Sequence, residues 1–173
     1  MFGTFLEHGE LAYFTHPVNL QTASNAATTG DWLSMANYHH LDILLLKGAG
    51  TASDDPTITV LQATSAAGAG SKALNFARII RNETTTAAGP LGTNWTITTG
   101  NTDNDYTHGT SAESVVIWVI PIESDELDVQ NGFFFVNATI ADVGSNDQFG
   151  AILGLFSKPR YIGAPTDRIS VYA

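Results

Sequence analysis

The sequence contains no cysteine, and this absence removes several kinds of chemistry from consideration. Disulfide bonds, thiolate metal sites and cysteine nucleophiles are all excluded. Charged residues are also scarce, at 14% of the chain, where a typical soluble protein has about 25%. Seven residues are Lys or Arg against 17 acidic ones, so the formal net charge is −10. A surface of this sign neither neutralises nucleic-acid phosphates nor docks on anionic lipid, so we expect neither nucleic acid nor membrane as a partner.

Long apolar runs and targeting signals are missing as well. No stretch approaches the roughly 20 apolar residues that span a bilayer. Residues 1–14 lack the basic start and the small-residue cleavage site of a signal peptide, so we expect a protein made in a cytosol-like compartment. The 173 residues, 43% of them hydrophobic, are enough for one domain with a sizeable core.

The pattern that is present is that of short β-strands. Runs rich in β-branched and aromatic residues recur, separated by clusters of Gly, Ser, Thr, Asn and Asp. The nearest approach to an amphipathic helix, residues 5–14, is interrupted by Gly9. We therefore predict an all-β fold, an antiparallel, jelly-roll-like β-sandwich of about eight or nine strands. The expected strands are residues 18–22, 32–35, 40–47, 57–64, 74–81, 95–99, 114–122, 133–140 and 148–157.

This strand pattern predicts one domain preceded by an arm. Residues 1–16 form the N-terminal arm, and residues 17–173 form the sandwich with an extended C-terminal segment. Three expected strands are apolar on both faces, in runs 43–46, 115–120 and 133–136. A two-sheet sandwich buries one face of each sheet, so the second face must contact the arm, a long loop or another subunit, and we favour a subunit. Trp118, inside the second run, is expected to be buried.

Residues with catalytic or metal-binding chemistry are few. The sequence has no nucleophile elbow, zinc-protease motif, phosphate loop or dinucleotide fingerprint. His39 and His40 point to opposite faces of an expected strand, so they do not converge on one metal ion. We therefore predict no enzyme activity, no catalytic residue, no cofactor and no metal ligand.

Two acidic clusters leave alternatives open. Asp103 and Asp105, with Asn101 and Asn104, could donate oxygens to Ca²⁺, but a complete calcium loop is missing. Such a segment is more typical of a solvated turn. The second cluster, within residues 123–128, is typical of a charged turn, whereas the carboxylates of a glycosidase face each other across a cleft.

Several short motifs, spread over residues 17–166, carry a family resemblance. The early motifs are residues 17–22 (PVNLQT), 29–34 (TGDWLS) and Asn37-Tyr38. The middle ones are residues 48–51 (GAGT), 55–59 (DPTIT), 62–64 (QAT) and 68–76 (GAGSKALNF). The late ones are residues 127–129 (LDV), 131–133 (NGF), 151–153 (AIL), 159–161 (PRY) and 163–165 (GAP). Together they resemble small virion structural proteins of tailed bacteriophages and prophages.

This resemblance implies a structural role. It implies a capsid decoration (cement) protein, with a β-sandwich subunit that forms a homotrimer and binds the lattice of the major capsid protein. Its expected location is the capsid exterior of the virion, after assembly in the cytoplasm of a bacterial host. No catalytic residues come with the family. The resemblance does not extend to residues 1–16 or to the last residues of the chain.

The two chain ends supply the candidate contacts with other subunits or with the capsid. The N-terminal residues offer apolar side chains, and the C-terminal segment carries three of the seven basic residues. The candidates are Phe2, Phe5, Leu6, Leu11, Tyr13, Phe14, Lys158, Arg160, Tyr161 and Arg168.

Two alternatives remain, the first to these terminal contacts and the second to the decoration function. In the first, both ends fold back over their own sandwich. In the second, the chain is a tail or baseplate jelly-roll module that binds host glycan, which requires an exposed aromatic platform and a groove. Trp32, Trp95 and Trp118 could form such a platform, but each lies in an expected strand with apolar neighbours, which favours packing in the core.

Overall fold

The computed structural model describes residues 5–21, 29–84, 91–109, 111–141, 143–144, 146–161 and 170–172, and this part of the chain is almost entirely β-structure. The predicted all-β class is confirmed. Short helical structure occurs in α1 (Phe5–His8) and in a 3₁₀ turn (Val129–Asn131), and no helix of the described residues is long and apolar enough to cross a membrane. The strands are β1 (Glu10–Asn19), β2 (Leu33–Ser34), β3 (Tyr38–Lys47), β4 (Thr57–Ala63), β5 (Lys72–Ala73), β6 (Arg78–Glu83), β7 (Thr96–Thr99), β8 (Asp105–Thr107), β9 (Val116–Glu123), β10 (Phe135–Ile140) and β11 (Phe149–Pro159).

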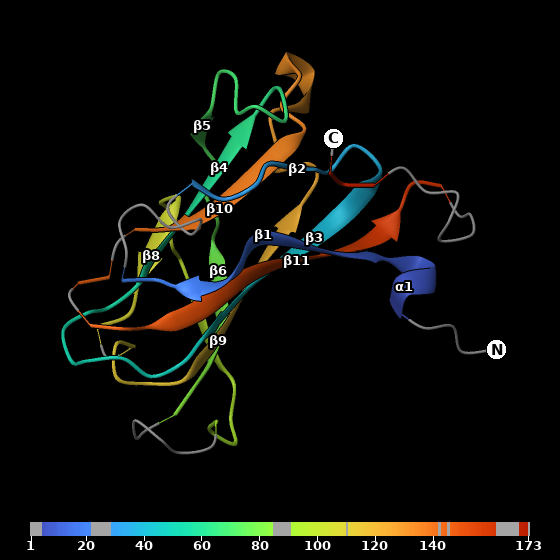
Figure 1. Cartoon of the computed structure of the whole chain (residues 1–173). Coiled ribbons are helices and arrows are strands. Elements are labelled where there is room, and N and C mark those ends of the chain that lie inside the picture. The colour runs from blue at the N-terminus through green and yellow to red at the C-terminus, as the bar shows by residue number, and fades with distance from the viewer. Residues whose placement is uncertain are drawn as a thin grey trace.

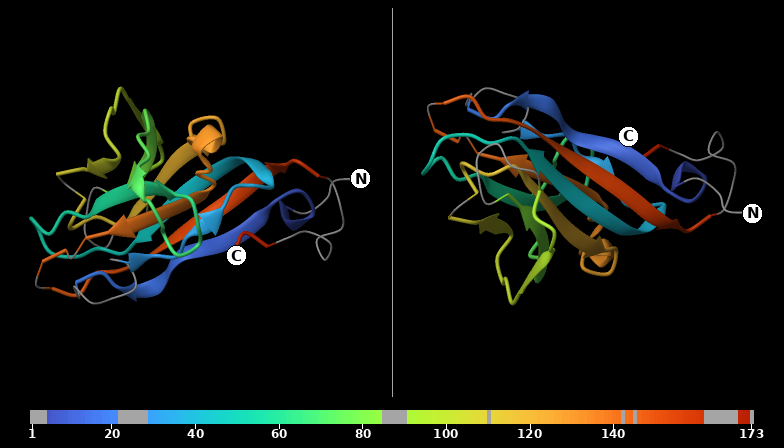
Figure 2. Two further views of the ribbon diagram at one scale, coloured as in Figure 1. Left: turned by 90° about the horizontal axis from the view of Figure 1, so that it is seen from above. Right: turned by 90° about the horizontal axis from the view of Figure 1, so that it is seen from below.

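The strands form two antiparallel sheets that pack as a sandwich. The first sheet has six strands in the order β1-β11-β3-β9-β6-β7, and the second has the order β2-β10-β4-β5, with β8 also paired to β4. Between β1 and β4, and again between β9 and β11, the chain changes sheet at every connection. Figures 1 and 2 show the layer with β4 and β10 stacked on the layer with β1, β3 and β11.

The core lies between the two inner faces and follows from the two-residue period of a strand. Along β3, Leu41, Ile43 and Leu45 are fully buried, while the residues between them face outward. The same alternation along β9 places Trp118 in the centre of the core at 0% exposure. The expectation that Trp118 is buried is therefore confirmed. Its indole packs edge-on against Tyr106, with ring centroids 5.3 Å apart.

The N-terminal region differs from the arm expected over residues 1–16. Residues 10–16 belong to β1, which pairs with β11 along the edge of the six-stranded sheet. Ala12 and Phe14 point into the core, and Phe14 is 1% exposed. The arm boundary at residue 16 is therefore wrong for residues 10–16. The strand expected at 18–22 is the end of this longer strand, which continues past Pro17 because an edge strand tolerates proline.

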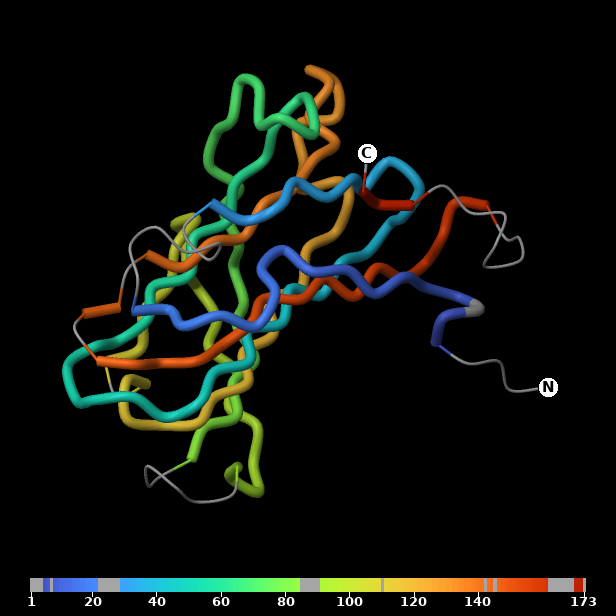
Figure 3. The backbone as a smooth tube through the Cα atoms, viewed as in Figure 1, coloured from blue at the N-terminus to red at the C-terminus, as the bar shows by residue number. Residues whose placement is uncertain are grey.

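The C-terminal residues 170–172 close the sandwich between β1 and β2. Val171 is buried in the core, and its carbonyl accepts a hydrogen bond from the amide of Ser34 in β2. Glu10 in β1 accepts hydrogen bonds from the hydroxyl of Ser170 and the amide of Val171. Figure 3 shows this red stretch beside the light-blue segment that holds β2. The end of the chain thus fastens the edges of the two sheets together.

We predict that Trp118→Ala lowers the free energy of unfolding by about 3–5 kcal/mol, because it leaves a cavity in the core. The matched control is Trp95→Ala, since Trp95 is 51% exposed and should cost less than about 1 kcal/mol. Urea unfolding followed by circular dichroism measures both. Equal losses in the two variants would contradict the position of Trp118 in the core.

Truncation separates residues that precede the sheet from residues that belong to it. Removal of residues 1–8 should leave a cooperatively folded domain, because β1 begins at Glu10. Removal of residues 1–14 should cost at least about 3–5 kcal/mol, since it deletes the buried Phe14. Thermal unfolding of the two truncated proteins compares them, and equal stability would be inconsistent with β1 as part of the sheet.

Candidate functional site

The outward face of the six-stranded sheet is apolar across its whole width. Strand register places one outward residue of each strand in a single row, because directly paired residues of antiparallel strands share a face. The centre of this row is Leu44, paired with Leu153 on one side and with Val119 on the other. In strand order, the complete row is Tyr13, Leu153, Leu44, Val119, Ile80 and Ile97.

A substantial part of this outer face is open to solvent. Leu11, Tyr13, Leu46, Ile97 and Phe149 are each at least 36% exposed. Their exposed surface is on the order of 500 Å², and the half-buried residues between them bring the face toward the ~800 Å² that each partner contributes to a standard interface. Isolated apolar residues at a surface need no explanation, but a continuous patch of this size indicates a contact surface. The expectation that runs 43–46 and 115–120 present a second apolar face is confirmed.

A shallow groove deepens one end of this face. It has a volume of about 460 Å³, and its walls include Pro17, Leu46, Ile117 and Phe149, together with Leu91 from the segment before β7. These side chains come from five different parts of the sequence. The groove offers a place for an apolar side chain of a partner, and it contains almost no polar surface.

The opposite end of the outer face is polar. His40 lies between two carboxylates, with Nδ1 2.9 Å from Glu123 Oε1 and Nε2 3.2 Å from Asp42 Oδ1. Lys158 Nζ donates to the same Glu123 oxygen at 3.0 Å. This hydrogen bond from Lys158 is the first cause, and the contact with His40 a further one, that holds the pKa of Glu123 below its usual value. The apolar face therefore has a charged, solvent-accessible border on this side.

Lys47 is the one buried lysine of the described residues, and it is the last residue of β3. Its Nζ donates hydrogen bonds to the carbonyls of Gly48, Ala112 and Ser114 at 2.8–3.0 Å. Burial disfavours the ammonium form and lowers the pKa of Lys47 to about 8, against the opposing field of Asp55. The side chain ties β3 to the segment before β9.

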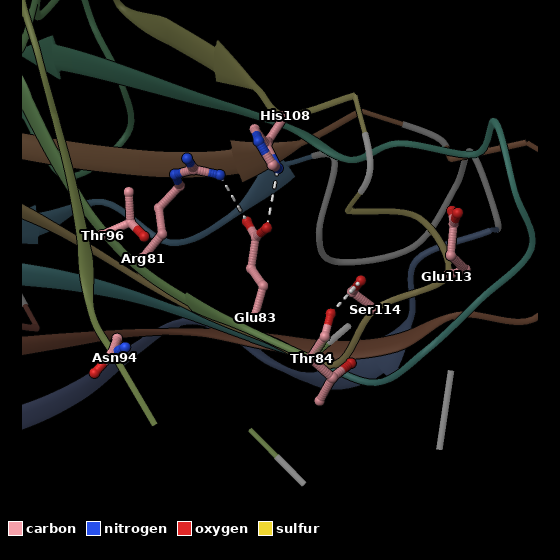
Figure 4. Close-up of a pocket in the computed structure, with 8 residues that line it drawn as sticks. All are labelled: Arg81, Glu83, Thr84, Asn94, Thr96, His108, Glu113 and Ser114. Atoms are coloured by element: carbon pink, nitrogen blue, oxygen red, sulfur yellow. Dashed lines mark hydrogen bonds and ion pairs between the residues drawn. The ribbon is translucent and has the colours of Figure 1, made fainter. Parts of the chain in front are cut away.

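A polar cavity of about 510 Å³ opens at the edge of the sandwich next to β6 and β7. At its centre, Figure 4 shows Glu83 between Arg81 and His108. Arg81 Nη1 lies 3.2 Å and His108 Nδ1 3.0 Å from the Glu83 carboxylate, which also accepts a 2.8 Å hydrogen bond from Trp118 Nε1. Three partners thus hold this carboxylate in place, and it anchors the core tryptophan. The remaining lining residues are Thr84, Asn94, Thr96, Glu113 and Ser114.

The acidic clusters form local structure. Asn101 Nδ2 donates hydrogen bonds to the carbonyls of Phe76 and Asp103. Asn104 Nδ2 donates to the carbonyl of Val60. Both side chains therefore stabilise the loop that precedes β8. In the second cluster, Asp128 forms an ion pair with Lys72. Among the described residues no group of three or more His, Asp or Glu side chains is arranged to hold a metal ion.

The three tryptophans do not share a surface. Trp118 is buried, Trp32 is half-buried, and Trp95 is exposed. Trp32 covers Gly68, whose missing Cβ would lie 2.6 Å from the indole nitrogen. The three indoles therefore form no common platform, and the expectation that they pack in the core is confirmed for Trp118 and wrong for Trp95.

The N-terminal contact candidates have different positions. Phe5 and Leu6 are exposed on α1, and Leu11 and Tyr13 are exposed on the outer face of β1. Phe14 is buried in the core and is not available to a partner, so its selection is wrong. Phe2 lies outside the described residues.

The C-terminal candidates lie at the polar end of the outer face. Lys158 is exposed and pairs with Glu123, and Arg160 is exposed, with its amide bonded to the carbonyl of Asn37. Tyr161 is 77% exposed. Arg168 lies outside the described residues.

Sequence reasoning missed most of the assembled site. Residues of β11 such as Leu153 and Leu155 were not among the candidates, although their alternation with buried Ile152 and Phe156 was a usable signal. No sequence signal groups Arg81 and Glu83 with His108. The first two lie in β6 and His108 directly follows β8, and only the packing of the two sheets brings these strands together.

A pH titration tests the environment of Lys47. Between pH 8 and 10.5 the unfolded chain binds more protons than the folded chain, so the free energy of unfolding should rise with pH across this window. The gain is about 1–3 kcal/mol, because the cost of burying the charge is full below the window and absent above it.

The control is Lys47→Met, which has no proton to lose and should lack this part of the rise. Urea unfolding at about pH 7, 9 and 10 measures both proteins, and the difference cancels the other titrating groups. Identical pH profiles would contradict the lowered pKa of Lys47.

Comparison of the chain with protein-family models, with curated proteins and with solved structures gives no match in any of the three. The candidate site is therefore defined by its own geometry. It consists of an apolar sheet face with a charged border, next to a polar cavity whose central carboxylate is held by three partners.

Proposed function

We propose that this chain is a non-enzymatic structural protein of a tailed-phage virion. In this proposal it is a capsid decoration (cement) protein that binds and stabilises the lattice of the major capsid protein. Support comes from the motifs over residues 17–166 that resemble small virion proteins and from the all-β subunit with an exposed apolar face. The motifs supply the family analogy and the exposed face supplies the physical argument.

We further propose that the sandwich is a jelly roll. In this interpretation β1-β11-β3-β9 is one four-stranded half, β2-β10-β4-β5 is the other, and β6 and β7 extend the first. The change of sheet at successive connections supports it. Jelly rolls occur in viral capsid and lectin domains, but a fold of this kind serves many functions, so the analogy alone does not assign one.

The apolar row across the outer face carries the proposal. Water contact with this row is unfavourable, and the two-sheet core cannot cover it because it points away from the second sheet. In the proposed assembly the face is buried in subunit contacts of a homotrimer, since closed symmetric oligomers bury such surfaces. A trimer fits the local three-fold positions of a capsid, where many weak contacts add through multivalency.

Charge supports a location on the capsid exterior. A net charge of −10 keeps the exposed surface soluble and repels packaged DNA. The proposed life cycle is assembly in the cytoplasm of the bacterial host followed by residence on the virion. The polar borders near Lys158 and Arg160 are the proposed contacts with the capsid protein, together with Phe5 and Leu6 of α1.

The polar cavity gives less support to an enzyme. Its carboxylate, Glu83, already accepts hydrogen bonds from Trp118 and Arg81 and contacts His108. A general acid or base needs access to substrate, whereas the Glu83 carboxylate is already engaged by three partners, one of them the buried Trp118. A tail or baseplate module that binds glycan is also less well supported, because the three tryptophans are separated.

Charge introduced at the centre of the outer face tests the proposal. Leu44→Lys should convert the homotrimer to monomer, because burying an unpaired lysine in an apolar interface is costly. The matched control is Thr59→Lys, on the outward side of β4 in the other sheet. Sedimentation and light scattering give the masses, and circular dichroism checks the fold.

Decoration is measured with purified heads of the phage that encodes the chain. The control should bind them like the unaltered protein, whereas Leu44→Lys should show reduced occupancy. An unaltered protein that sediments only as a monomer would contradict the proposed trimer. Full occupancy of the heads by Leu44→Lys would contradict the proposed role of the outer face in decoration.

A further inference from the structure

The four-residue strand β7 is an edge strand that has no charge, no proline and no irregular register to block pairing. It pairs with β6 on one side and ends the six-stranded sheet on the other. Alternate residues of an edge strand direct both the N–H and the C=O away from the sheet. Within the part of the chain that the structure describes, no hydrogen bond joins the backbone of residues 95–99 to anything beyond β6. Free donors and acceptors on this edge can accept another strand.

The other sheet edges are protected, which makes β7 stand out. On β1, the amide and carbonyl of Tyr13 both bond to the Tyr172 hydroxyl, Pro17 lacks an N–H, and the register shifts twice. On β2, Leu33 pairs with Tyr172. Strands β5 and β8 are only two and three residues long, and each carries a charged residue, Lys72 or Asp105. Short length, charge, proline and irregular register are the devices by which proteins prevent edge pairing.

The segment that carries β7 has no charge of its own, although Arg78 and Arg81 of β6 lie across from Thr99 and Thr96. Residues 84–102 contain no charged side chain, in a chain whose net charge is −10. Ile97 is 58% and the adjacent Trp95 is 51% exposed. Figure 2 shows the yellow-green part of the chain, which includes β7, on the side of the sandwich away from α1 and both marked chain ends. The edge is thus accessible, uncharged and composed of residues with high β-propensity.

We propose that β7 pairs with β7 of a second copy of this chain, antiparallel and about a two-fold axis. The pair joins two six-stranded sheets into one continuous sheet. Because Ile97 ends the outward apolar row, the row continues across the axis into the second subunit. Both free edges are used up in this pair, so it closes at two copies instead of growing into a fibre.

The neutrality of the segment favours a second copy over another kind of partner. Two copies bring identical edges together, and like charges on them would repel. A charged partner would be expected to select an edge with charges of opposite sign, and residues 84–102 have none. Thr96, Thr98 and Thr99 suit self-pairing, because threonines across paired strands form hydrogen bonds.

The contact is small, and its strength follows from that size. The four residues of each β7 strand, which include Ile97, together with Trp95 next to them, bury much less than the roughly 1,200 Å² of a stable interface. The pair is therefore weak in dilute solution and strengthened where copies are held close together. It requires neither the trimer nor a capsid, so it can be tested separately from the proposed function.

Disulfide trapping in this cysteine-free chain tests the pairing directly. Single cysteines replace Thr96, Ile97, Thr98 and Thr99 in turn, and mild oxidation followed by non-reducing electrophoresis measures covalent dimer. About a two-fold axis, a residue and its own copy separate by about 7 Å along the strand for each position from the axis. A disulfide needs Cα atoms about 4.4–6.8 Å apart. We therefore expect efficient dimer at one position or two adjacent positions, and little at the others.

Two controls complete the experiment. His16→Cys places an exposed cysteine on the protected edge strand β1 and should give only the low yield of random collision. Leu44→Lys combined with the best β7 cysteine should still give covalent dimer, which separates edge pairing from the outer-face contact. Yields at all four β7 positions no higher than His16→Cys, or equal at all four, would overturn the proposal.

Discussion

Packing of the two inner faces against each other is the interaction on which the rest of this structure depends. Leu41, Ile43 and Leu45 of β3 and Trp118 of β9 are fully buried between the sheets. Since a strand alternates with a period of two, burying these residues forces Leu44 and its neighbours to the opposite face. The apolar outer surface is therefore a direct consequence of the core. It cannot be removed by a change of register without exposing the core itself.

Closure of the sandwich depends on contacts between the two ends of the chain. Glu10 near the start bonds to Ser170 and Val171 near the end, and Tyr172 covers the backbone of Tyr13. These interactions fill the gap between β1 and β2. The chain itself closes this side of the sandwich, and the open edge of the six-stranded sheet is the opposite one, at β7. One edge of this sheet is therefore protected and the other is free.

Polar side chains inside the sandwich link segments that are distant in the sequence. Lys47 satisfies three carbonyls where β3 meets the segment before β9, and Glu83 holds the indole of Trp118. Buried polar groups are costly unless they are paired, and here each pairing joins segments distant in sequence. Such an arrangement favours one register over its alternatives. It leaves the outer surfaces, with few charges, as the parts that are free for contact.

The sequence by itself determined the fold class and the approximate position of most strands. Residues 57–64 and 40–47 were predicted as strands from β-branched and apolar runs, and they correspond to β4 and most of β3. The burial of Trp118 followed from its apolar neighbours. These features are local, because strand propensity and alternation depend on residues a few positions apart.

Tertiary structure alone decided which strands are neighbours and which edges are covered. Residues 10–16 were assigned to an arm, yet β1 pairs there with β11, more than 130 residues later in the chain. The row through Leu44 and Leu153 and the contact of His108 with Glu83 likewise join residues that no local pattern links. Whether a strand is central or at an edge depends on the sum of all pairings. The free edge of β7 is therefore a property of the folded chain, since its own residues do not say what lies beside them.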